Sequence, residues 1–149
     1  MQVSNGTLTS AASTVTPQVV APSFFLWDTA GHIAATHGDY SLIGTATSVP
    51  AGTPAAPGET IVVWGNGFGA TNPAAVNGQV QAGAAPLVQI PTIQFNGANG
   101  TVLFAGLTGT GLYQINVTVP SSVADGDASV VALTLGVSSP INGLITIKH

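Results

Sequence analysis

The chain has 149 residues, which suffices for one domain with its own core. It contains no cysteine, which excludes disulfides and thiolate chemistry, and Lys148 is its only Lys or Arg residue. Only 4% of the residues are charged, against roughly 25% in an average globular domain, and 45% are hydrophobic. This composition excludes disorder, and it excludes nucleic-acid binding because affinity for phosphates comes from Lys and Arg. No apolar run reaches the length of about 18 residues that a membrane span needs.

The residue pattern predicts an all-β protein, an immunoglobulin-like antiparallel β-sandwich with an extended N-terminal β arm. Nineteen glycines and ten prolines interrupt any helical period. Short runs rich in Val, Ile, Thr and aromatic residues recur between turn residues, which is typical of a sandwich. In 112–119 apolar and polar side chains alternate, as in a strand buried on one face. The predicted strands are 13–20, 23–28, 31–36, 39–47, 59–66, 78–82, 87–95, 101–105, 112–119, 128–136 and 142–148.

Residues 1–21 are predicted to be an arm, and residues 22–149 the sandwich domain. The arm consists of small, polar and uncharged residues with apolar ones at intervals. Three interpretations stay open from the sequence. The arm is a strand severed from a preceding domain, or it pairs within its own domain, or it adds as a strand to a neighbouring copy. The third is possible because the unpaired amides and carbonyls of a lone strand can form hydrogen bonds with the edge strand of another sheet. For the third case the self-association contacts are assigned to Thr7, Val15, Val19 and Val20.

His37, Asp39 and Ser41 have the residue types of a catalytic triad in the wrong order. A triad needs the imidazole between the carboxylate and the hydroxyl, whereas Asp39 lies in the middle of this segment. A structural hydrogen bond between His37 and Asp39 that pins a turn is the preferred interpretation. No catalytic residue is predicted, and the chain is not expected to be an enzyme.

The stretch Gly65-Asn-Gly67-Phe-Gly69-Ala70 fits a variant of the dinucleotide-binding fingerprint. A functional fingerprint opens a helix, whose amides meet the pyrophosphate, and an acidic residue follows about 20 residues later. Here Thr71-Asn72-Pro73 follows, and no Asp or Glu occurs between Glu59 and Asp125. We therefore expect a core strand that ends in a tight glycine turn, and no cofactor.

Candidates for a metal site are few. The three histidines, at positions 32, 37 and 149, are scattered along the chain. Asp125-Gly126-Asp127 offers two of the six to eight oxygens that Ca²⁺ takes. Asp and Gly both suit the backbone angles of turns, so this triplet is predicted to be a turn between strands, and no metal is expected.

Aromatic side chains support an alternative function. Trp27, Trp64 and Tyr113 could stack against sugar rings if two or three of them were exposed in one plane. The alternative prediction is a glycan-binding module of a larger secreted or surface protein, with polysaccharide as its partner.

Several stretches together resemble a known family. The stretches are His32–Ile43, Pro57–Pro73, Leu103–Leu107, Gly111–Pro120, Ala124–Asp127 and Gly136–Pro140. They resemble the C-terminal Ig-like domain at the ends of large secreted proteins of Acidobacteria, especially Solibacter-type soil bacteria, and the second stretch is also similar to IPT/TIG domains. The resemblance covers residues 20–148 and implies a sandwich of seven or more strands outside the cell, with no catalytic residues to carry over.

The leading prediction is a non-enzymatic structural or adhesive module, extracellular or at the cell surface. Its expected partners are copies of itself or neighbouring Ig-like domains. The net charge of −4 opposes association only weakly, so an uncharged surface suits a self-associating protein. If the arm adds to the next copy head to tail, the contact does not close on itself and builds a filament.

Overall fold

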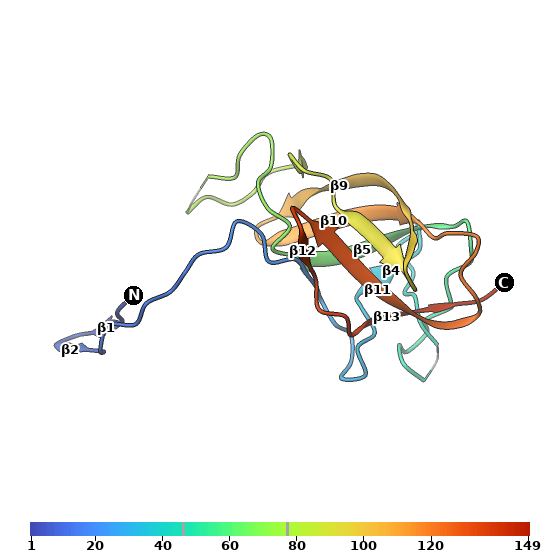
Figure 1. Ribbon diagram of the computed structural model, residues 1–149, viewed down its shortest axis with the longest axis horizontal. Coiled ribbons are helices and arrows are strands. Elements are labelled where there is room, and N and C mark those ends of the chain that lie inside the picture. Colours follow the sequence, from blue (N-terminus) through green and yellow to red (C-terminus); the bar gives the residue numbers. More distant parts are fainter. Residues whose placement is uncertain (46, 77) are drawn as a thin grey trace.

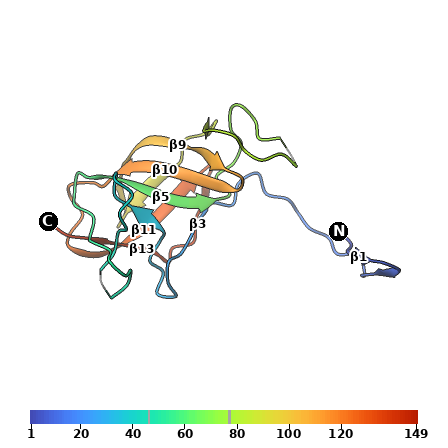
Figure 2. The ribbon, with the colours of Figure 1, turned by 180° about the vertical axis from the view of Figure 1, so that it is seen from behind.

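The computed structural model describes residues 1–45, 47–76 and 78–149, and every regular element in these ranges is a β-strand. The predicted all-β class is therefore confirmed. Two larger antiparallel sheets pack against each other, and the N-terminal arm projects from this body (Figures 1 and 2). The strands are β1 (Ser4–Asn5), β2 (Leu8–Thr9), β3 (Ser23–Phe24), β4 (Ala35–Thr36), β5 (Thr60–Asn66), β6 (Ala85–Pro86), β7 (Thr92–Phe95), β8 (Ala98–Asn99), β9 (Thr101–Gly109), β10 (Leu112–Thr118), β11 (Gly126–Thr134), β12 (Val137–Ser138) and β13 (Gly143–Ile147).

The first sheet has the strand order β3-β5-β10-β9-β6, and β4 also pairs with β5. Its centre is the antiparallel pair of β5 and β10, in which Val63 lies opposite Ile115 and Ile61 opposite Val117. All four of these side chains are buried, whereas their neighbours along each strand point to the other face. The alternation predicted for 112–119 is therefore confirmed.

The second sheet has the order β12-β11-β7-β8, and β13 also pairs with β11. Along β11 the inward-facing residues are small or medium-sized, namely Ala128, Val130 and Ala132, and all are buried. Ala128 lies opposite Ile145 of β13, and Ala132 lies opposite Ile93 of β7. Larger side chains on the flanking strands thus fill the space that the alanines leave, and the two sheets enclose one core.

The long predicted strands are confirmed, with shifted ends, as β5, β9, β10, β11 and β13. Three other predictions are wrong: the described residues of 13–20, 39–47 and 78–82 contain no strand. In 39–47, Tyr40 adopts φ 67° within a turn, and only single bridges follow it. Pro91 lacks the amide that a ladder needs, so the strand predicted for 87–95 is confined to β7.

Candidate functional site

The N-terminal arm, residues 1–19, is exposed along its whole length. Its outer part is a small hairpin in which β1 pairs with β2 around a turn at Gly6, and the amide of Ser13 donates to the carbonyl of Met1 at its base. A two-stranded hairpin with no core is marginally stable on its own. Thr7 lies in the turn of this hairpin, so the prediction that it belongs to a single extended donor strand is wrong.

Residues 14–19 connect the hairpin to the body. On an extended chain Val15, Pro17 and Val19 lie on one face, and hydroxyl and amide side chains lie on the other. Val15 is 58% exposed and Val19 is 82% exposed, so the domain does not cover this apolar face. We call residues 14–19 the arm linker.

The arm is fixed to the body at the glycine turn, Gly65–Gly69. The amide of Ala21 donates to the carbonyl of Gly67 at 2.9 Å. A Cβ atom on Gly67 would lie 1.9 Å from the carbonyl oxygen of Ala21, and one on Gly69 would lie 2.9 Å from Val20. The glycines are therefore required by the close approach of the arm base, and this explains the fingerprint-like spacing. The predicted core strand is confirmed as β5, which ends at Asn66, and the glycines after it, Gly67 and Gly69, have φ 75° and 109°, although no regular turn is assigned to them.

Val20 anchors the arm to its own domain. Its side chain is only 5% exposed and lies beside Gly69 of its own domain. The assignment of Val20 to self-association is therefore corrected. Of the four residues assigned to self-association, Val15 and Val19 are the ones that the structure leaves uncovered in the arm linker.

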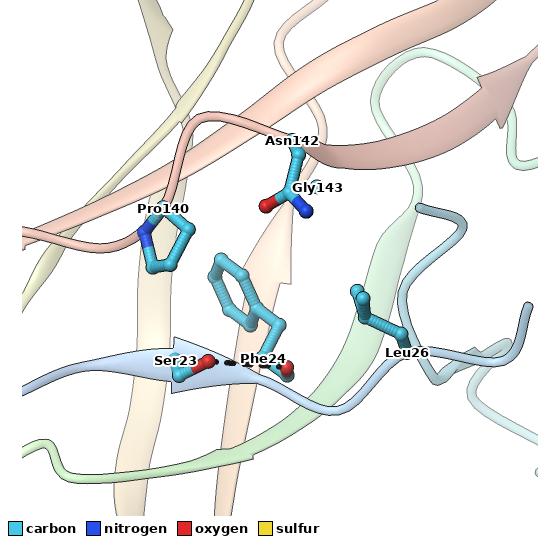
Figure 3. Close-up of a pocket in the computed structure, with 6 residues that line it drawn as sticks. All are labelled: Ser23, Phe24, Leu26, Pro140, Asn142 and Gly143. Atoms are coloured by element: carbon cyan, nitrogen blue, oxygen red, sulfur yellow. Dashed lines mark hydrogen bonds between the residues drawn. The ribbon is translucent and has the colours of Figure 1, made fainter. Parts of the chain in front are cut away.

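A pocket opens beside β3, between the edges of the two sheets (Figure 3). It has a volume of about 130 Å³, and no charged side chain lines it. Leu26 at this pocket is 47% exposed, and Ile141, which lies in the sequence between the lining residues Pro140 and Asn142, is 80% exposed. The lining residues, which define what we call the β3 pocket, are Ser23, Phe24, Leu26, Pro140, Asn142 and Gly143.

The three aromatic residues predicted to bind a glycan do not form one platform. Trp64 lies opposite Gln114 in the first sheet, and so the neighbouring Tyr113 points to the opposite face. Tyr113 packs against Phe68, with ring centroids 5.8 Å apart, and its hydroxyl donates to the carbonyl of Gly69. Burial raises the pKa of the Tyr113 hydroxyl. Trp27 is exposed, on a separate hairpin.

A different aromatic pair shares the outer face of the first sheet. Trp64, Gln114 and Gly106 form one row across β5, β10 and β9. The ring of Phe104 lies over Gly106, since a Cβ there would meet the tip of this ring at 2.8 Å. The amide of Gln114 donates to the side chain of Asn116 on the same face. Phe104 could not be predicted from the sequence, because the pairing of β9 with β10 determines which face of the sheet its side chain lies on.

Each histidine is paired with a carboxylate through its Nδ1 atom. His37 contacts Glu59 at 2.5 Å, whereas Asp39 accepts hydrogen bonds from the amide and hydroxyl of Ser41. The predicted bond between His37 and Asp39 is therefore wrong, although the segment is a turn. The ring of His149 contacts Asp125 at 2.6 Å.

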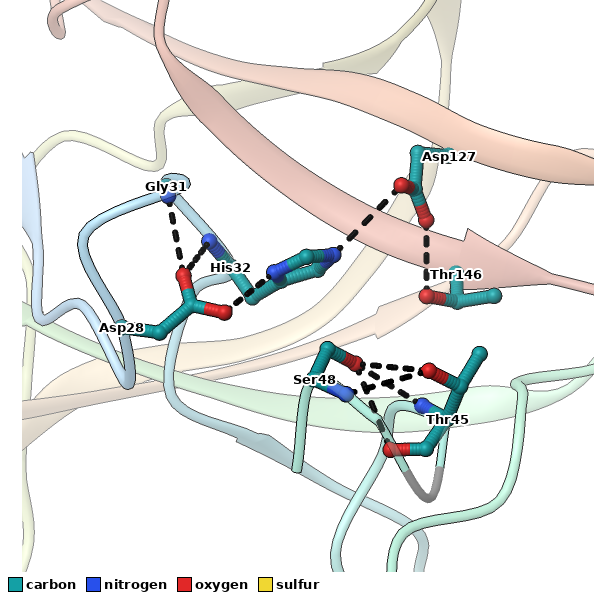
Figure 4. A network of polar contacts seen from close by, with 7 residues as sticks. All are labelled: Asp28, Gly31, His32, Thr45, Ser48, Asp127 and Thr146. Atoms are coloured by element: carbon teal, nitrogen blue, oxygen red, sulfur yellow. Dashed lines mark hydrogen bonds and ion pairs between the residues drawn. The ribbon is translucent and has the colours of Figure 1, made fainter. Parts of the chain in front are cut away.

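His32 lies between two aspartates that come from distant parts of the chain (Figure 4). Its Nδ1 contacts Asp28 at 2.7 Å, and its Nε2 lies 3.5 Å from Asp127. Desolvation raises the pKa of Asp28, but hydrogen bonds from His32 and Gly31 outweigh it, so this pKa lies below its usual value. Asp127 also accepts a hydrogen bond from Thr146.

This cluster lines an open cavity of about 340 Å³, to which Thr45 and Ser48 also contribute. Asp125 lies in a bend, and Gly126 and Asp127 begin β11, so the prediction that Asp125-Gly126-Asp127 is a turn is wrong. The sequence placed Asp28 near His32, but the approach of Asp127 depends on how the two sheets pack. The cluster joins the hairpin of residues 26–33 to the second sheet.

Within the described ranges, no three His, Cys, Asp or Glu side chains gather in a way that could hold a metal ion. Those ranges also contain no helix suited to crossing a bilayer. Comparison of the chain with protein-family models, curated proteins and solved structures gave no match.

Proposed function

We propose that this protein is a non-enzymatic structural or adhesive module, extracellular or at the cell surface, that assembles with copies of itself through its N-terminal arm. The observation that supports this proposal is the arm linker: an uncharged segment with an apolar face that its own domain leaves uncovered. The Ig-like architecture expected from the sequence suits such a module, since it presents loops and edges at both ends of a rigid body.

The composition of this segment suits pairing with a protein surface. Ordering six backbone residues costs conformational entropy of about 1–2 kcal/mol each. Strand addition offsets this cost with main-chain hydrogen bonds, while Val15 and Val19 leave water. No charged side chain in the arm has to be desolvated.

Deleting residues 1–19 is expected to abolish assembly and leave a folded monomer, because Val20 and the glycine turn remain. The mass in solution would be measured by light scattering, and the particles would be viewed by negative-stain electron microscopy. Deleting only residues 1–13 is the matched control and is expected to preserve assembly, since the arm linker is retained. A monomeric full-length chain, or unchanged assembly after removal of residues 1–19, would overturn the proposed function.

The second candidate is a glycan-binding module, and the outer face of the first sheet favours it. Trp64 and Phe104 present aromatic rings on one face together with the amides of Gln114 and Asn116. Stacking on aromatic rings combined with amide hydrogen bonds is a chemistry that suits a sugar, which has apolar ring faces and hydroxyl edges.

If this candidate is right, Trp64→Ala is expected to lower the affinity for a soluble polysaccharide at least tenfold, because the stacking surface is lost. Binding would be followed by calorimetry across a panel of polysaccharides. Trp27→Ala is the control, because Trp27 is exposed but lies on another element. Equal losses in both variants, or no binding by the unmodified chain, would remove this candidate.

A further inference from the structure

The β3 pocket lies beside an edge strand. β3 is the terminal strand of the first sheet and pairs with β5 on one side. In the part of the chain that the structure describes, no strand pairs with its other side. Exposed edge strands present unpaired amides and carbonyls, and they are the sites at which an extended segment adds to a sheet.

The pocket offers apolar volume next to this edge. Phe24 forms its floor, with the exposed Leu26 at its rim and Pro140 on the opposite side (Figure 3). A cavity of about 150 Å³ accommodates a benzene molecule, so 130 Å³ accommodates the isopropyl group of a valine. An extended chain that adds to β3 can therefore insert one medium-sized apolar side chain between the two sheets.

The arm linker has the pattern that such a site requires. Val15 and its alternate neighbours form an apolar face with no charge. Pro17 has no amide hydrogen to donate, so its backbone nitrogen must lie on the side of the linker that faces away from the pairing strand. Pairing through Thr14 and Thr16 meets this condition, because the amides of alternate residues point to opposite sides of a strand.

The linker does not reach this pocket in its own chain. A return of the linker along β3 needs Val20 and Ala21 as a tight turn. Such a turn pulls Val20 out of its buried site and breaks the hydrogen bond from Ala21 to Gly67. The segment that fits the β3 pocket therefore comes from a second copy of the chain.

We infer that the β3 pocket is the acceptor site for the arm linker of a neighbouring copy, with Val15 seated between Leu26 and Pro140. This inference rests on the proposed function and adds the receiving surface to it. Val15 is four residues beyond Val19, where the arm leaves the body, which corresponds to about 13 Å of extended chain. The two sandwiches therefore lie close together, and donation in one direction, from each arm linker to the β3 pocket of the next copy, makes the assembly grow head to tail.

Cysteine cross-linking tests this placement against a chain that has no native cysteine. The double variant Val15→Cys/Leu26→Cys is expected to give, after mild oxidation, a ladder of covalent oligomers on a denaturing gel. A disulfide requires Cα atoms within about 7 Å, so the ladder reports direct proximity. Each single variant is expected to stop at the dimer, because one cysteine per chain links only two chains.

The matched control is Val15→Cys/Leu103→Cys, since Leu103 is exposed on β9, outside the stretch Gly106–Leu107 that pairs with β6, at the other side of the same sheet. A ladder from this control and none from the first variant would place the acceptor at β9 and overturn the inference. If deletion of residues 1–19 abolishes assembly but Val15→Cys/Leu26→Cys gives no more cross-linked product than the single variants, the acceptor is wrong and the proposed function stands. If the deletion leaves assembly unchanged, both are overturned.

Discussion

Gly67→Ala is expected to lower the free energy of unfolding by about 2–4 kcal/mol. Gly67 has φ 75°, where a non-glycine residue costs about 1–2 kcal/mol, and its new Cβ would lie 1.9 Å from the carbonyl oxygen of Ala21. The two nearest obstructing atoms, the carbonyl oxygen and carbonyl carbon of Ala21, both belong to the backbone. The segment that holds Val20 must therefore move away from the glycine turn. Urea unfolding followed by tryptophan fluorescence measures the loss, and proteolysis near Val20 reports release of the arm.

Gly111→Ala separates these two effects. Gly111 has φ 72°, and nothing lies within 4 Å of the position where its Cβ would stand. This control therefore carries the backbone cost alone, about 1–2 kcal/mol. Equal losses in the two variants would contradict the account in which the arm base requires a glycine at position 67.

Phe68→Ala is expected to cost about 3–5 kcal/mol in unfolding free energy, the largest effect of any change considered for this protein. The ring is 1% exposed and lies between Phe24 and Tyr113, with centroids at 6.0 and 5.8 Å. It also lies close to Gly65, where a Cβ would meet the ring at 3.0 Å. The cavity left by alanine removes the support of Phe24, which forms the floor of the β3 pocket.

Phe68→Leu retains most of the volume and is expected to cost less than about 1.5 kcal/mol. Phe25→Ala is the second comparison, because Phe25 directly follows β3 and is also a phenylalanine, but its side chain is exposed. Thermal or urea unfolding of the three variants gives the ranking. If Phe68→Ala destabilises the protein no more than Phe25→Ala, the ring does not join the glycine turn to the core.

The sequence predicted the centre of each sheet because alternation there is set locally. In β10 every second side chain is apolar, and a strand of that pattern buries one face whatever its neighbours are. Short strands such as β6 and β12 have two residues each and no pattern of their own. Their pairing depends on the longer strands beside them, so no local feature of the sequence predicts where these short strands form.

The candidate sites were predicted less completely, for the same physical reason. The exposed linker could be anticipated, because uncharged residues with spaced valines stand out in any sequence. The β3 pocket joins residues 23–26 to residues 140–143, which meet only after two sheets have packed. The histidine pairs show the same limit: His37 selects the distant Glu59 over the nearby Asp39.

The anchoring of the arm also determines how a pulling force enters the domain. Tension on the arm reaches the body first at Val20 and at the hydrogen bond between Ala21 and Gly67, and then passes through β3 into β5. β5 is supported on its other side by β10 along most of its length. Because few bonds hold Val20 and Ala21, they yield under load before the two central strands separate. We therefore expect the attachment of the arm at the glycine turn to open first under tension, while the sandwich stays intact.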